Sequence, residues 1–175
     1  MKAEAVAKPH AYHGEGVIWA DDWGGGHPAL RYVDMLAGDV LELQPGGDVT
    51  RFHVGDVAAA LRPRAGGGAI VATERGFALT RSVDFADLEH TADLWPSTHE
   101  PRTRFNDGGC APDGSFYMGS MAYDQSEGAA SMWRLAPDRS TSHVFGDVTI
   151  SNGLCWSPDG TLAYYNDTPT RIIWV

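Results

Sequence analysis

The chain has 175 residues, of which 43% are hydrophobic and 21% are charged, so it is long enough and apolar enough to fold around its own core. Lys and Arg number 13 against 23 Asp and Glu, and the formal charge of −10 disfavours nucleic acid as a partner. Residues 1–14 hold no apolar run of signal-peptide length, and no stretch approaches the roughly 18 apolar residues of a membrane-spanning helix. We therefore expect a cytoplasmic protein without a membrane partner.

Short apolar and β-branched runs, broken by Gly, Pro, Asp and Asn, predict an all-β chain. The predicted strands fall into four groups. The first two groups cover residues 16–20, 30–34, 40–44 and 49–54, and then 57–62, 69–73, 77–82 and 88–94. The last two cover residues 108–111, 115–119, 131–136 and 141–145, and then 153–157, 162–166 and 171–175.

A sequence repeat shows which positions in the strand groups are equivalent. Gly68, Gly114 and Gly160 are spaced 46 residues apart, and each precedes a predicted strand. Four strands in a unit of about 40–50 residues are typical of a β-propeller blade. A two-sheet sandwich is the competing all-β fold, but it gives no reason for this period. The sequence therefore predicts a single β-propeller domain over residues 1–175, covering about three and a half blades.

Such a propeller is not closed. Three blades and three strands of a fourth leave sheet edges open, and open edges favour pairing with other chains. We expect either that the domain is incomplete at its C-terminus or that self-association through these edges closes it.

Three oxygen-bearing residues recur at the start of the first strand of a blade. Glu15, Asn106 and Asn152 hold this position in the first, third and fourth blades, whereas the second blade has Ala60. Because first strands line the channel of a propeller, these side chains would face one axis. Carboxylate and amide oxygens suit Ca²⁺, Mg²⁺ or Mn²⁺ and are tolerated by Zn²⁺. Asn-Gly is equally a turn former, so the residues alone leave both interpretations open.

Other polar residues lie beside these positions. Arg104, two residues before Asn106, could hold a carboxylate, a hydroxyl or a developing oxyanion, whereas Arg102 has the pattern of a solvated loop arginine. Asp107 and Asp124 could bind hydroxyl groups.

The histidines and cysteines form no zinc motif. His10 and His13 lie close together in an N-terminal segment that we expect to be mobile. Cys110 and Cys155 lie within apolar runs, so we expect buried thiols.

Three segments together resemble the regucalcin/gluconolactonase/luciferin-regenerating-enzyme family. They are Gly14–Trp19 (GEGVIW), Arg104–Gly108 (RFNDG) and Ile150–Leu154 (ISNGL). The resemblance implies a six-bladed propeller that binds one divalent metal ion, Ca²⁺ or Zn²⁺, with Mg²⁺ or Mn²⁺ as alternatives. By position it implies that Glu15 and Asn152 are metal ligands. It likewise implies that Arg104, Asn106 and Asp124 bind the substrate.

The resemblance also implies an activity, the hydrolysis of a sugar lactone to the aldonic acid by metal-activated water. The family's third ligand, an Asp that is also its favoured catalytic base, falls in a later blade, and Asp167 lies at the wrong register to replace it. We therefore expect impaired metal binding and little activity if the protein ends at Val175. A non-catalytic calcium-binding propeller and an aryl-ester or organophosphate hydrolase on the same fold are the alternatives.

Overall fold

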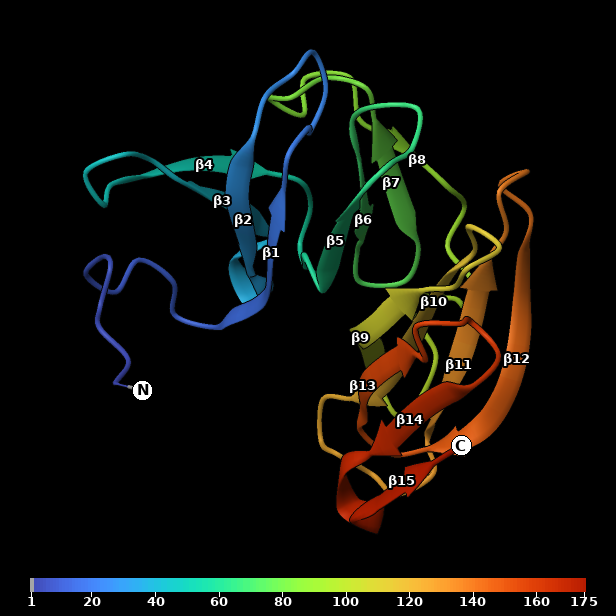
Figure 1. Ribbon diagram of the computed structural model, residues 1–175. Helices are drawn as coiled ribbons and strands as arrows, with labels where there is room; N and C mark the ends of the chain where they lie inside the picture. Colours follow the sequence, from blue (N-terminus) through green and yellow to red (C-terminus); the bar gives the residue numbers. More distant parts are fainter. Residues whose placement is uncertain (1) are drawn as a thin grey trace. The chain divides into compact units, whose positions relative to one another are not determined.

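The computed structural model describes residues 2–175 and consists almost entirely of antiparallel β-strands (Figure 1). The chain forms two compact units. One comprises the residues up to 73 together with 77–91, and the other comprises residues 74–76 and 92–175. The described helices are single 3₁₀ turns, η1 (Met35–Ala37) and η2 (Thr168–Thr170), and none is long and apolar enough to cross a membrane.

Each unit contains two sheets whose strands follow one another in chain order. The first unit has β1 (Gly14–Ala20), β2 (Ala29–Asp34), β3 (Asp39–Leu43) and β4 (Val49–His53) in one sheet, and β5 (Ala60–Pro63), β6 (Ala69–Ala72), β7 (Phe77–Thr80) and β8 (Glu89–His90) in the other. The second unit has β9 (Thr103–Cys110), β10 (Phe116–Ala122), β11 (Ala130–Leu135) and β12 (Thr141–Val148), followed by β13 (Ser151–Trp156), β14 (Ala163–Asp167) and β15 (Ile172–Trp174). These sheets are propeller blades, so the predicted all-β propeller fold is confirmed.

The predicted repeat register is confirmed at the hairpin glycines. Gly68, Gly114 and Gly160 all have φ between 70° and 83°. This left-handed backbone is easily adopted only by glycine, and it ends each turn before the next strand. The largest boundary difference is in β9, which begins at Thr103 rather than at residue 108. Its polar first half lacks a strand pattern, but its backbone pairs with the end of β10.

The strands of a blade differ in burial. β6 and β7 are buried at every position, whereas β8, β12 and β15 are largely exposed. β15 exposes Ile172, Ile173 and Trp174, and self-association through this edge stays a prediction. The expectation of buried thiols is wrong, because Cys110 and Cys155 are both exposed. Cys110 is the last residue of β9, and Cys155 alternates with the half-buried residues on either side of it in β13.

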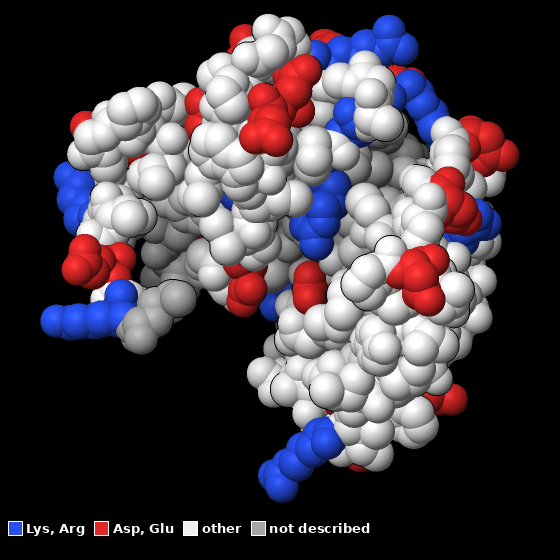
Figure 2. All heavy atoms as spheres, viewed as in Figure 1, with Lys and Arg blue, Asp and Glu red and all other residues white. Residues whose placement is uncertain are grey.

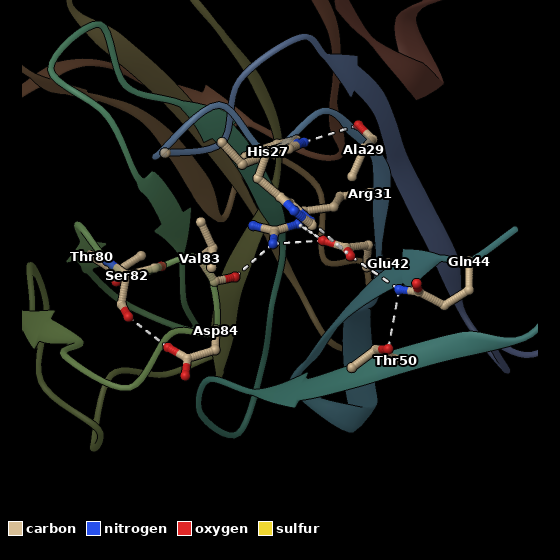
Figure 3. A network of polar contacts seen from close by, with 12 residues as sticks. His27, Ala29, Arg31, Glu42, Gln44, Thr50, Thr80, Ser82, Val83 and Asp84 are labelled. Atoms are coloured by element: carbon tan, nitrogen blue, oxygen red, sulfur yellow. Dashed lines mark hydrogen bonds and ion pairs between the residues drawn. The ribbon is translucent and has the colours of Figure 1, made fainter.

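A buried ion pair joins two neighbouring strands of the first unit (Figure 3). The Arg31 side chain is 1% exposed, and its Nε donates to Glu42 Oε2 at 2.8 Å while Nη2 donates to the Val83 carbonyl at 2.6 Å. The guanidinium also lies within 5.5 Å of the ring centroids of three aromatic residues, Trp23, Phe52 and Phe85. Burial would raise the pKa of Glu42, but hydrogen bonds from His27, Arg31 and Gln44 outweigh it, and the pKa is lowered. This network ties β2 and β3 to the loop that follows β7.

On the face drawn in Figure 2, side chains of both signs are scattered over a mostly uncharged surface. The described residues on that face therefore show no continuous basic patch of the kind that binds nucleic acid.

Candidate functional site

A β-bulge follows Glu15 in the first strand of the first blade. Glu15 and Ile18 both pair with β2, but their registers differ by one residue, because Gly16 and Val17 together oppose a single residue. Gly16 has φ of 58°, a left-handed conformation that glycine adopts without strain. A bulge bends its strand and re-aims the neighbouring side chains.

The same irregularity recurs in the second unit. In β13 the register shifts between Asn152 and Cys155, and Gly153 has φ of 61°. In β9 the shift falls at Asn106 itself, the extra residue between two residues that pair with β10. By contrast β5, which begins at Ala60, pairs with β6 without any shift. The bulges thus coincide with the three oxygen-bearing positions that the repeat singled out, and the blade with alanine has none.

First strands also lie side by side within each unit. In the first unit, a Cβ added to Gly16 would lie 3.9 Å from Ala60 Cα. In the second, a Cβ added to Gly109 would lie 2.6 Å from the Leu154 carbonyl oxygen, so only glycine allows β9 and β13 this approach (Figure 1). The bulges of β9 and β13 consequently lie on neighbouring strands.

The structure brings Arg104 and Asn106 together. Arg104 is 5% exposed, and its Nη1 donates to Asn106 Oδ1 and to the Phe105 carbonyl, both at 2.9 Å. Asn106 Nδ2 donates in turn to the Ser151 carbonyl at 2.8 Å. The Asn106 side chain is therefore hydrogen-bonded through both its oxygen and its nitrogen. These bonds link the Arg104 guanidinium to the start of β13.

Asn152 follows directly after that contact. Its Nδ2 donates to Thr168 Oγ1 at 3.2 Å, which leaves the amide oxygen Oδ1 as the end suited to a cation. The backbone N–H of Gly153 donates to Asp107 Oδ2 at 2.8 Å. Asp107, expected to contact hydroxyl groups, thus holds the bulge of β13 in place.

Glu15 belongs to the first unit, and its side chain is 54% exposed. His13 Nε2 lies 3.8 Å from its Oε1. The backbone N–H of His13 donates to Asp34 Oδ1 at 3.0 Å, and its carbonyl accepts from Met35 N–H at 2.9 Å. A ring nitrogen of His10 lies 2.9 Å from the Gly47 carbonyl oxygen. The segment expected to be mobile is therefore anchored to the first blade, and the imidazole of His13 is held beside Glu15.

Two other aspartates, Asp124 and Asp167, bond to groups of the protein itself. Asp124 is exposed, and its Oδ1 accepts from the Ser126 hydroxyl at 2.8 Å and from its N–H at 3.0 Å, which lowers the pKa of Asp124. Asp167 is buried and accepts from the N–H groups of Thr149 and Ile150 at 3.0 and 2.7 Å. Asp167 thus satisfies backbone donors that precede β13.

The sequence did not predict Tyr123, which contacts Arg104, or Glu74, which holds Tyr123. The ring of Tyr123 lies under the Arg104 guanidinium at 5.6 Å, and the Tyr123 hydroxyl donates to Glu74 Oε1 at 2.7 Å. Arg102, expected as a solvated arginine, donates to the same carboxylate oxygen at 2.7 Å. Tyr123 and Glu74 lie 49 positions apart, and neither belongs to a motif, so the sequence carries no signal for their contact.

The oxygen donors of Glu15 and Asn152 are of the type that binds hard cations. Glu15 offers a carboxylate and Asn152 an amide oxygen, the ligand types that Ca²⁺ takes. Among residues 2–175, no group of three or more His, Cys, Asp or Glu side chains could hold a metal ion.

Comparison with protein families gives one match over most of the chain. A model described as the SMP-30/Gluconolactonase/LRE-like region matches residues 13–175. Regucalcin of Danio rerio is 31% identical over 171 residues, which cover 96% of this chain and 55% of regucalcin. The 6-deoxy-6-sulfogluconolactonase of Pseudomonas putida is 30% identical over 153 residues, which cover 87% of this chain and 52% of that enzyme.

Solved structures agree with this match. Regucalcin from Agrobacterium tumefaciens, described as a calcium-binding protein, superposes with a TM-score of 0.77 and 27% identity over 93% of this chain and 53% of its own. A luciferin-regenerating enzyme superposes with a TM-score of 0.78 over 93% of this chain and 55% of its own, and at 24% identity it supports the fold alone. The chain spans about half the length of the curated relatives it matches.

Proposed function

Because the chain belongs to the SMP-30/gluconolactonase/LRE-like family, we propose that the protein hydrolyses a sugar lactone to the aldonic acid with the help of one divalent cation. The observation that carries this proposal is the pair Arg104 and Asn106. A buried guanidinium is hydrogen-bonded to an amide at a β-bulge, and that amide is bonded to the residue before Asn152. A relative named for acting on a sugar lactone supports the same substrate class.

In this proposal Glu15 and Asn152 hold the cation. When bound, the cation would polarise the lactone carbonyl and lower the pKa of water. The oxygen donors favour Ca²⁺, and Mg²⁺, Mn²⁺ and Zn²⁺ are compatible with them. A relative described as calcium-binding supports the first choice.

The residues of the second unit would act on the sugar. Lactone hydrolysis adds water to the carbonyl carbon and breaks the bond to the ring oxygen, which leaves as a hydroxyl group. Arg104 would orient the sugar and stabilise the negative charge that develops on the carbonyl oxygen. Asn106 would hold Arg104 in place, and Asp124 would accept hydrogen bonds from sugar hydroxyls in exchange for those from Ser126.

The test is acid release from glucono-1,5-lactone in a pH-stat, with metal-stripped protein and Ca²⁺, Zn²⁺, Mn²⁺ or Mg²⁺ restored. We expect metal-dependent turnover, and we expect Arg104→Met to lower kcat/KM by about 10²-fold, as for loss of one oxyanion donor. Arg134→Met is the matched control, because Arg134 bonds to Ser115 and Asp113 at the first hairpin of the third blade. Equal turnover by Arg104→Met and the control would refute the role of Arg104.

A calcium-binding protein without catalysis is the second candidate, favoured by the description of the Agrobacterium tumefaciens relative. It predicts calorimetric Ca²⁺ binding that depends on Glu15, with no acid release from any lactone. The polar pair of buried Arg104 and half-buried Asn106 gives less support to an aryl-ester or organophosphate hydrolase, whose substrate would favour an apolar pocket.

A further inference from the structure

A tyrosine held at both ends lies against Arg104. Tyr123 directly follows β10, and its backbone N–H donates to the Arg102 carbonyl at 2.9 Å. At the other end, its hydroxyl donates to Glu74 Oε1 at 2.7 Å. With the main chain and the hydroxyl both fixed, the ring has a defined orientation.

Two guanidinium groups contact this ring. Arg102 lies 4.8 Å and Arg104 5.6 Å from its centroid, both within the range of a cation–π interaction. Arg102 is 64% exposed at its side chain and is also bonded to Glu74, whereas Arg104 is buried. The tyrosine ring therefore contacts both an exposed arginine and the buried arginine that bonds to Asn106.

Glu74 anchors the tyrosine to the same strand that carries Arg104. Its side chain is only 11% exposed, and its backbone carbonyl accepts from Phe105 N–H at 2.8 Å. Burial would raise the pKa of Glu74, but hydrogen bonds from Tyr123 and Arg102 outweigh it, so the pKa is lowered. Burial, with the bond to Glu74, raises the pKa of Tyr123 to about 12, so the phenol keeps its donor proton at neutral pH.

These contacts form one continuous path. It runs from the Glu74 carboxylate to the Tyr123 hydroxyl, from the tyrosine ring to the Arg104 guanidinium, and from there to Asn106 and the carbonyl before Asn152. A long arginine side chain has many rotamers, and each contact along this path removes some of them. Fixing such a group before the substrate arrives lowers the cost of binding.

We propose that Tyr123, held by Glu74, is a positioning residue that fixes the Arg104 guanidinium beside Asn106 for the substrate. The inference rests on the proposed role of Arg104 in binding the lactone. It assigns no proton transfer to Tyr123, which acts only through Arg104. The proposal adds Tyr123 and Glu74 to the residues that determine substrate binding. Glu74 lies in the turn between β6 and β7.

The first test measures Arg104 itself, independently of activity. In an NMR spectrum of the Arg Nε–Hε groups, we expect the Arg104 signal, identified by its loss in Arg104→Lys, to be shifted by the tyrosine ring. Tyr123→Leu should remove the shift and broaden the signal, whereas Tyr123→Phe, which keeps the ring, should retain most of it. An Arg104 signal unchanged in Tyr123→Leu would overturn the proposal.

The second test is kinetic and uses glucono-1,5-lactone. We expect Tyr123→Leu to raise KM about three- to thirtyfold, the range of a cation–π contact, with Tyr123→Phe nearer to the wild type. Tyr12→Leu is the matched control, because Tyr12 is 96% exposed, and equal unfolding midpoints of all variants exclude a loss of fold. Unchanged KM in Tyr123→Leu contradicts the positioning role. Absence of turnover in the wild type refutes the proposed function instead, and the NMR result then decides the role of Tyr123 alone.

Discussion

Replacing Gly119 with alanine tests how closely β10 packs against the start of β13. A Cβ added to Gly119 would overlap both Oγ and Cβ of Ser151 and would lie 3.2 Å from Met132 Cε. Ser151 is fully buried, so it cannot move into solvent, and its carbonyl accepts the hydrogen bond from Asn106. Overpacking a buried site costs about 1–3 kcal/mol, and overlap with two atoms of one side chain predicts the upper end, about 3 kcal/mol.

The assay is urea unfolding followed by tryptophan fluorescence, with thermal unfolding beside it. At about 2–4 °C per kcal/mol for a chain of this size, the unfolding temperature should fall by about 6–12 °C. Gly146→Ala is the matched control, because its Cβ would meet nothing closer than 3.8 Å. Adding Ser151→Gly to Gly119→Ala should recover most of the loss. Equal stability of Gly119→Ala and Gly146→Ala would refute this account of the packing.

Three further changes probe buried charge. Arg31→Met leaves the Glu42 carboxylate buried without its guanidinium and should cost about 3 kcal/mol in urea unfolding, whereas Arg134→Met breaks a partly exposed pair and should cost less than about 1 kcal/mol. Burial would raise the pKa of Asp34, but two backbone N–H groups and one guanidinium outweigh it and lower the pKa. The stability contributed by Asp34 is therefore full above about pH 4 and is lost as the pH falls through the lowered folded-state value, so Asp34→Asn should flatten the pH dependence of unfolding below pH 4. Asp167→Ala leaves two backbone N–H groups before β13 without their acceptor and should cost about 2–4 kcal/mol in the same assay, and a cost below about 0.5 kcal/mol would contradict that role.

Much of the fold follows from local sequence signals. Each hairpin turn requires one residue with a left-handed backbone, which only glycine adopts easily, as at Gly114. Because these glycines recur at a constant spacing, the blade repeat can be predicted from the sequence. The first half of β9 could not be predicted from sequence, because it is polar and its strand conformation depends on pairing with β10. The burial of Arg31 could not be predicted, since its partners come from three separate segments. The prediction that Cys155 is buried is wrong because an apolar run does not show which face of the strand other residues cover.

Part of the candidate site can also be predicted from local sequence signals. Glu15 and Asn152 are each followed by a glycine, which is the local requirement of the bulge found there. The contact of Arg104 with Asn106 lies within two residues and could be anticipated. The support from Tyr123 and Glu74 joins residues far apart in the chain, and Asp124 makes local turn bonds that sequence position does not reveal.

The central proposal is that Glu15 and Asn152 hold one cation. A double-mutant cycle of Glu15→Gln and Asn152→Ala, measured as Ca²⁺ affinity by calorimetry, tests it most directly. Each single variant should bind Ca²⁺ at least about tenfold more weakly, and the loss in the double variant should be smaller than the sum of the two single losses, because contacts to one shared ion are coupled. Unchanged affinity in either single variant, or two independent losses that add in the double variant, would contradict a shared site.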